Sequence, residues 1–263
     1  MILEERAYIK MKFSKRMDLF GESIFTTLAN MRSERKKQGL EVIDLSIGAP
    51  NIPPTQEVME TIAKEALKPE NYLYAIKDSV DLQNTVKEWY ERRYGVVIDP
   101  TTELTSLLGS QDGLAHLALT LVDEGDTVLV QDPCYPIFRD GPLLAGAHVV
   151  TMPLLKENDY LIDFDRIDEK TAQDAKYMIV SYPNNPTCGV ANDEFYKKLI
   201  VFAKKYNIMV LHDNAYSELL FEGPGHSFLE FEGAKDVGIE FNSLSKTYGL
   251  AGARIGFALG NKE

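Results

Sequence analysis

Lys246 is the residue in this sequence whose surroundings most clearly suit covalent chemistry. Two serines, Ser243 and Ser245, lie just before it, and the residues between Lys246 and Arg254 carry no charge. Exposed lysines usually lie on amphipathic faces among other charged side chains, and this setting is different. It suits an amine that binds covalently to a carbonyl cofactor.

The run Ser243-Leu244-Ser245-Lys246, with Arg254 eight residues after the lysine, resembles the active-site motif of class I/II aminotransferases. These are aspartate aminotransferase-like, fold type I enzymes that use pyridoxal 5'-phosphate (PLP). The resemblance implies that Lys246 holds PLP as a Schiff base, the internal aldimine. It also implies that Ser243, Ser245 and Arg254 bind the cofactor, Arg254 through a bidentate contact with the phosphate. Hydroxyl groups also occur beside lysines by chance, so the rest of the chain has to supply the partners.

The elements that would position these residues alternate between short apolar β-branched runs and helical stripes. This alternation predicts an α/β domain around a mainly parallel sheet. Seven strands are expected near residues 104–108, 127–131, 148–152, 177–182, 208–212, 237–242 and 254–259. Residues 1–50 lack the alternation and read as an N-terminal arm.

Ligands of open α/β sheets bind beyond the carboxyl ends of the strands, and polar residues follow several of the predicted ones. Ser110 and Gln111 follow the first strand and lead into a helix, whose free backbone N–H groups suit a phosphate. An ordinary helix cap at Ser110 stays open as an alternative. Tyr135 follows the second strand between two prolines, as a ring to stack on a heterocycle or as a core side chain.

Three more residues complete the resemblance. Asn185, in Tyr182-Pro183-Asn184-Asn185-Pro186-Thr187, and Tyr216 match the residues that contact the phenolic oxygen of PLP, and Asn185 also borders the substrate. Asp213 matches the carboxylate that keeps the pyridine nitrogen protonated. Read alone, the Asn-Pro pair is a common turn and Asp213 could cap the next segment. Cys188 stands where the family has glycine.

Two matches concern the substrate and a second subunit. Gly48, in Leu45-Ser46-Ile47-Gly48-Ala49-Pro50, resembles the glycine whose backbone borders the substrate carboxylate. Tyr74 resembles the tyrosine that reaches the phosphate of the neighbouring subunit, which implies a homodimer with shared active sites. The glycine expected a few residues after Tyr74 is absent, and Gln83 stands where arginine is frequent.

The resemblance also implies the architecture. We expect a three-layer αβα large domain over 51–263, with a seven-stranded sheet that contains one antiparallel strand. Residues 1–50 would form the arm and the N-terminal part of a small domain. The C-terminal part of the small domain, with the arginine that binds the substrate α-carboxylate, has no counterpart in this sequence.

Composition excludes several classes of function. The net charge is 28 minus 40, or −12, which argues against nucleic-acid or anionic-membrane partners. Two cysteines and four histidines at unrelated spacings predict neither a disulfide framework nor a metal site. The sequence shows no signal region and no apolar run long enough to span a membrane, so we expect a cytoplasmic protein.

The predicted function is a PLP-dependent aminotransferase that moves an amino group from an L-amino acid to a 2-oxo acid. Lys246 would act as general base and acid in a ping-pong cycle, helped by Asp213 and Tyr216. A carbon–sulfur β-lyase and a non-catalytic PLP-binding module are the alternatives. An unrelated nucleotide-binding domain is disfavoured, because both glycine-rich phosphate motifs are missing. The sequence does not name the amino donor.

Overall fold

The computed structural model describes residues 11–46, 48 and 50–263 and divides the chain into two compact units, 1–48 and 49–263. The first unit contains a short 3₁₀ helix, Lys15–Leu19, and helix α1, Ile24–Lys37. Among the described residues, no helix combines the length and the apolar character needed to cross a membrane. The signal-region prediction concerned the first residues of the chain, and residues 1–10 lie outside the described ones.

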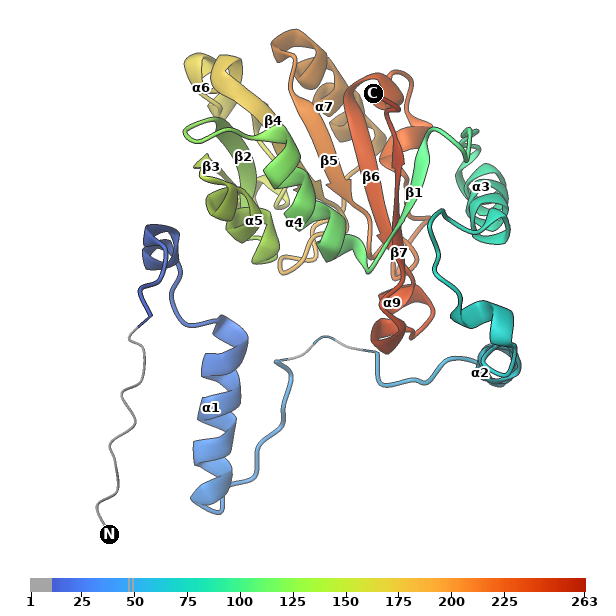
Figure 1. The fold of residues 1–263 in the computed structure, drawn as a ribbon. Helices are drawn as coiled ribbons and strands as arrows, with labels where there is room; N and C mark the ends of the chain where they lie inside the picture. The colour runs from blue at the N-terminus through green and yellow to red at the C-terminus, as the bar shows by residue number, and fades with distance from the viewer. Residues whose placement is uncertain (1–10, 47, 49) are drawn as a thin grey trace. The chain divides into compact units, whose positions relative to one another are not determined.

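The second unit is built on one seven-stranded sheet in the order β1-β7-β6-β5-β4-β2-β3 (Figure 1). Its strands are β1 Leu104–Leu107, β2 Thr127–Asp132, β3 His148–Pro153, β4 Ala175–Ser181, β5 Met209–Asp213, β6 Gly238–Ser243 and β7 Gly256–Gly260. β7 pairs antiparallel with both β1 and β6, and every other pair is parallel. The prediction of a mainly parallel sheet with one antiparallel strand is confirmed.

Helices cover both faces of this sheet, which gives the expected three layers (Figure 1). The helices of this unit are α2 Gln56–Glu65, α3 Val80–Tyr94, α4 Ser110–Leu121, α5 Ile137–Ala145, α6 Glu169–Asp174, α7 Asp193–Tyr206, α8 Ala234–Val237 and α9 Leu244–Thr247. Apolar side chains of α4 and α5 pack on one face of the sheet. Those of α3, α6 and α7 pack on the other face.

Local sequence explains where these elements begin and end. The run Val128–Val130 is fully buried, as expected for a central strand covered on both faces. Asn192 caps α7 by accepting from the backbone N–H of Phe195, and α7 ends where Asn207 takes a left-handed conformation. Gly95 ends α3 in the same way, with φ 67°.

The strand directions place several strand ends at the same edge of the sheet, where ligands of α/β domains usually bind. β2, β4, β5 and β6 run parallel to one another, and β1 runs parallel to β6, since both are antiparallel to β7. Their carboxyl ends therefore meet at one edge. β7 runs the other way, so its beginning lies there, and it starts at Gly256 rather than at Arg254 as predicted.

Candidate functional site

Asp213, the last residue of β5, is a buried carboxyl group at this end of the sheet. Its side chain is enclosed, and Oδ1 has no hydrogen-bond partner among the described residues. The pKa of Asp213 is raised to about 7, mainly by burial and also by the charge of Glu240, while the charge of Lys246 opposes the shift. A buried carboxylate with an unused acceptor oxygen is prepared for a cationic or N–H donor partner.

Lys246 lies in α9, directly after β6. Ser243 caps α9 by accepting from the backbone N–H of Ser245, and the two serine hydroxyls are 2.9 Å apart. Lys246 Nζ is 5.8 Å from the centre of the Tyr216 ring. Burial lowers the pKa of the Lys246 amine, and the charge of Asp213 works in the opposite direction. The amine is thus shifted toward its neutral, nucleophilic form.

Tyr216 and Asn185 meet at the same edge from two different strands. Asn185 Nδ2 donates to the hydroxyl oxygen of Tyr216 at 3.3 Å. Burial, together with the charge of Asp213, raises the pKa of Tyr216, which keeps the phenol neutral. Helix α3 holds the segment after Tyr216, because Tyr94 donates to Ser217 Oγ at 2.9 Å.

The turn that carries Asn185 is fixed by buried amide groups. Gln131 Oε1, at the end of β2, accepts from the Ser181 backbone N–H at 2.8 Å and from Asn184 Nδ2 at 3.2 Å. Asn184 Oδ1 in turn accepts from the Thr187 hydroxyl at 2.7 Å. Cys188 closes this turn with φ 61°, a left-handed conformation that favours glycine. Cys188 thus takes a backbone conformation that glycine adopts more easily.

The turn before α4 lies against Arg254. Gly109 has φ 91° and is the N-cap residue of α4, so Ser110 is the first helical residue and the alternative of a Ser110 cap is wrong. A Cβ on Gly109 would collide with the Arg254 guanidinium. Arg254 Nη2 donates to the Leu108 carbonyl at 3.2 Å. A Cβ on Gly256 would lie 2.8 Å from the Ser110 backbone nitrogen, which explains why glycine starts β7.

Tyr135 connects this turn to Asp213. Its hydroxyl donates to Gln111 Oε1 at 2.8 Å, and its half-buried ring contacts Phe138 edge-on. Burial raises the pKa of Tyr135, with Asp213 adding to the shift and Arg254 opposing it. Tyr135 is thus neither an isolated surface ring nor a fully buried core residue.

The structure brings together ten of the twelve predicted site residues. They come from the ends of five strands and the start of β7, and they are Ser110, Gln111, Tyr135, Asn185, Asp213, Tyr216, Ser243, Ser245, Lys246 and Arg254.

The other two predicted residues are Gly48 and Tyr74. Gly48 is exposed and belongs to the 1–48 unit, and its neighbours Ile47 and Ala49 lie outside the described residues. Tyr74 is 98% exposed, and no hydrogen bond, ion pair or ring contact in 11–46, 48 and 50–263 joins it to the other ten.

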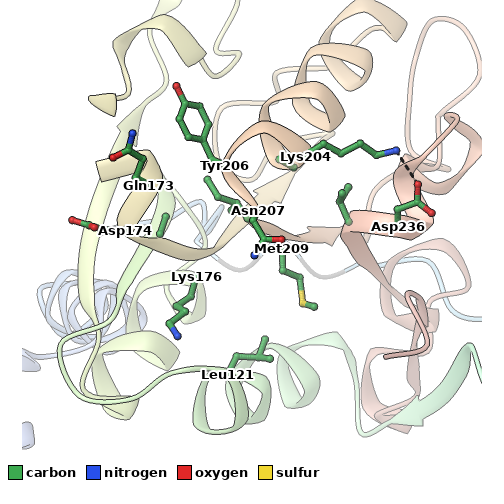
Figure 2. Close-up of a pocket in the computed structure, with 13 residues that line it drawn as sticks. Leu121, Gln173, Asp174, Lys176, Lys204, Tyr206, Asn207, Met209 and Asp236 are labelled. Atoms are coloured by element: carbon green, nitrogen blue, oxygen red, sulfur yellow. Dashed lines mark hydrogen bonds and ion pairs between the residues drawn. The ribbon is translucent and has the colours of Figure 1, made fainter. Parts of the chain in front are cut away.

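A cavity of about 720 Å³ lies at the opposite edge of the sheet (Figure 2). Its lining comes from the beginnings of β4 and β5 and from the end of α7, including Lys176, Asn207 and Met209. Lys204 and Asp236 form an ion pair of 2.8 Å at its side (Figure 2). None of the predicted site residues lines it, so this cavity is separate from the candidate site.

Sequence reasoning missed three residues that support the site, Gln131, Asn184 and Glu240. All three are buried polar side chains. Gln131 and Glu240 stand beside the apolar residues Val130 and Phe241 in strands that are buried. A polar residue there needs partners, so this signal could have marked the two residues, although it does not say what they contact.

Curated proteins are similar to this chain in sequence over most of its length. An LL-diaminopimelate aminotransferase from Aquifex aeolicus is 44% identical over 255 residues, which cover 96% of this chain and 66% of that protein. One from Dehalococcoides mccartyi is 43% identical with the same coverage. The chain thus spans 66% of the length of these curated relatives.

Solved structures share the fold. Substrate-bound BacF from Bacillus subtilis superimposes with a TM-score of 0.89 at 36% identity, covering 96% of this chain and 64% of that one. A double mutant of Thermus thermophilus aspartate aminotransferase gives a TM-score of 0.88 at 26% identity, with coverages of 96% and 65%. The model of the family "Aminotransferase class I and II" matches residues 41–263. This chain therefore belongs to the class I and II aminotransferase family, whose members use pyridoxal phosphate.

Proposed function

We propose that this chain carries the PLP-binding catalytic site of an aminotransferase that acts on an L-amino acid and a 2-oxo acid. The observation that supports this most is Asp213, a buried carboxylate whose Oδ1 lacks a hydrogen-bond partner among the described residues. It lies within electrostatic reach of Lys246 and faces Tyr135 and Tyr216. These residues supply a carboxylate, an amine and two phenols close to one another. A pyridine aldehyde such as PLP needs such groups for its ring nitrogen, its aldehyde, its ring face and its phenolic oxygen.

The residues present fit this cofactor at each of its ends. Asp213 would hold the pyridine nitrogen, and Tyr135 would lie on the ring. Asn185 and Tyr216 would hold the phenolic oxygen. A larger set would bind the phosphate: the α4 N-terminus with Ser110 and Gln111, the hydroxyls of Ser243 and Ser245, and the Arg254 guanidinium beside Gly109. When bound, PLP supplies a protonated ring that withdraws electrons from the substrate Cα.

The chain's own residues supply the proton transfers. The burial that lowers the pKa of Lys246 leaves a larger fraction of its amine unprotonated at neutral pH. Lys246 would hold the aldehyde carbon of the cofactor and, once the substrate amine has displaced it, would take the proton from the substrate Cα. Asn185 and Tyr216 are already joined by their hydrogen bond of 3.3 Å, so the pair needs no rearrangement to orient the phenolic oxygen.

Substrate, partners and location are further parts of the proposal. The curated relatives carry the name LL-diaminopimelate aminotransferase, so LL-diaminopimelate is the first amino donor to test. We propose a cytoplasmic homodimer in which Gly48 borders the substrate and the exposed Tyr74 reaches the partner's phosphate. Residues 1–50 would belong to the arm and small domain, and 51–263 to the large domain.

The cofactor proposal is tested by the visible absorbance of purified protein after incubation with PLP and removal of the excess. We expect a yellow protein, and we expect Lys246→Ala to lose the covalent absorbance band. Lys198→Ala is a matched control, because Lys198 is an exposed lysine on α7 that forms an ion pair of 2.8 Å with Glu194. A colourless wild type would refute PLP binding.

The reaction class is tested with a panel of amino acids that includes LL-diaminopimelate. We expect 2-oxo acid formation that requires a second 2-oxo acid, which is the mark of ping-pong amino transfer. Release of pyruvate and ammonia from a single substrate would contradict the proposal and support a β-lyase. Sedimentation velocity of wild type and Tyr74→Phe, with PLP retention measured in parallel, tests the homodimer and the role of Tyr74.

A further inference from the structure

A second buried carboxylate, Glu240, lies next to Asp213 on the other side of the sheet. Its side chain is completely buried. The β5–β6 register pairs Asp213 with Phe241 and His212 with Glu240, so the two carboxylates belong to adjacent rungs of neighbouring strands. Side chains alternate along a strand, and Glu240 therefore faces α3 and α7 while Phe241 faces the other side.

Glu240 is surrounded by hydrogen-bond donors. Its Oε1 accepts from the Tyr90 hydroxyl at 2.8 Å and from the Ser227 hydroxyl at 2.9 Å. Its Oε2 accepts from the Phe228 backbone N–H at 2.7 Å and lies 3.1 Å from His212 Nδ1. Three donors, the two hydroxyls and the Phe228 N–H, together with the nearby His212 ring nitrogen, hold this carboxylate in one position.

The phenols that face Glu240 carry no positive charge that could cancel the charge of its carboxylate. Burial raises the pKa values of Tyr90, Tyr94 and Tyr196, so these phenols, which face Glu240, stay neutral. His212 is itself completely buried and shares its other ring nitrogen with the Tyr196 hydroxyl at 3.3 Å.

Three titratable side chains among the described residues face Asp213. Lys246 faces it from α9, and the neutral phenols of Tyr135 and Tyr216 face it from the loops after β2 and β5. Because Asp213 is enclosed and Oδ1 lacks a protein partner, little in the described structure screens it from a nearby anion.

We propose that Glu240 is a positioning residue for Asp213: its buried negative charge increases the affinity of Asp213 for a proton, or for a protonated ring nitrogen bound to it. The inference rests on the proposed function, in which Asp213 holds the pyridine nitrogen of PLP. Glu240 touches neither substrate nor cofactor and acts through the electrostatic field at Asp213. Its contacts with His212, Tyr90, Ser227 and the Phe228 N–H hold the carboxylate in place.

The test is a ¹³C NMR titration of the Asp213 carboxyl carbon in the 263-residue chain without added PLP, with Asp213→Asn used to identify the resonance. Glu240→Gln removes the charge and keeps the shape. Its amide oxygen can accept from Phe228 and His212, and its NH₂ can donate to the two hydroxyls. We expect the Asp213 midpoint to fall by about one pH unit. Ser227→Ala is the control, because it removes one hydrogen bond and leaves the Glu240 charge, and it should not lower the midpoint.

A second measurement does not depend on the folding of Glu240→Gln. The Glu240 carboxyl carbon of the wild type should show an inflection at the pH where Asp213 titrates, and Asp213→Asn should lose that inflection. An unchanged Asp213 midpoint in Glu240→Gln, or a Glu240 resonance that ignores Asp213, would refute the proposal. Failure of the wild type to bind PLP would refute the proposed function and leave these titrations unaffected.

Discussion

Replacing Asp213 by asparagine should change the unfolding free energy of the cofactor-free chain in a way that depends on pH. Relative to wild type, Asp213→Asn should gain more stability at high pH than at low pH. Burial raises the pKa of Asp213 from 3.8 to about 7. The folded state therefore holds the proton more tightly than the unfolded state does. As pH rises from 3.8 to about 7, Asp213 lowers the free energy of unfolding by a growing amount. Above about pH 7 this loss of stability is complete and stays constant. Asparagine cannot ionise and removes this cost.

The size of the effect follows from the shift. The difference between about 7 and 3.8 corresponds to about 4 kcal/mol of unfolding free energy above the higher pKa, at 1.36 kcal/mol per pH unit. At about pH 5 the unfolded carboxyl is already ionised, and the cost is about 2 kcal/mol. An unpaired buried amide adds a cost of roughly 1–3 kcal/mol that does not depend on pH. The decisive quantity is therefore the change with pH, about 2 to 3 kcal/mol between pH 5 and pH 8.5.

The assay is urea denaturation of wild type and Asp213→Asn at the two pH values, without PLP. Asp165→Asn, at an exposed position, corrects for the loss of one negative charge from a chain of net charge −12. The reasoning predicts that the difference in unfolding free energy between Asp213→Asn and wild type grows toward high pH. A difference that stays constant or shrinks from pH 5 to pH 8.5 would show that Asp213 is not a buried group with a raised pKa.

Three other substitutions test the geometry of the site. Cys188→Gly should raise the unfolding free energy by about 1 kcal/mol, because glycine adopts φ 61° without strain; Cys188→Ala should give no gain in the same denaturation experiment. Arg254→Lys should weaken PLP retention during dialysis, since a point charge replaces a bidentate fork; equal retention would remove Arg254 from the phosphate site. Gln131→Leu should cost roughly 1–3 kcal/mol by leaving the Ser181 N–H and Asn184 without their acceptor, and an unchanged denaturation midpoint would contradict that bond pattern.

Local patterns in the sequence were enough to predict the sheet. Apolar β-branched runs such as Val128–Val130 indicated buried strands, and the stripe of Phe195, Leu199, Phe202 and Tyr206 indicated a helix that packs on the core. The antiparallel strand came from the family resemblance, because strand direction depends on pairing between distant segments. The start of β7 was placed two residues early, since the left-handed conformation of Arg254 is not visible in residue types.

Most site residues could be named from the sequence, and their supporting groups could not. Lys246, Asp213 and Asn185 stand in short motifs whose residue types already indicate their chemistry. Gln131 and Glu240 act across strands, 50 residues from Ser181 and 28 from His212 respectively, and no local pattern reveals such partners. Their burial and hydrogen bonds exist only once the sheet is assembled.

The sequence by itself determined the strands, the helices and the residue types that meet at the edge of the sheet, because these follow from local periodicity and from short motifs. Only the tertiary structure decided the electrostatics. It showed that Asp213 is enclosed near Glu240, that Asp213 Oδ1 has no hydrogen-bond partner in the described part of the chain, and that burial lowers the pKa of Lys246. The reason is physical: a pKa depends on desolvation and on charges from distant segments, and the fold alone sets both.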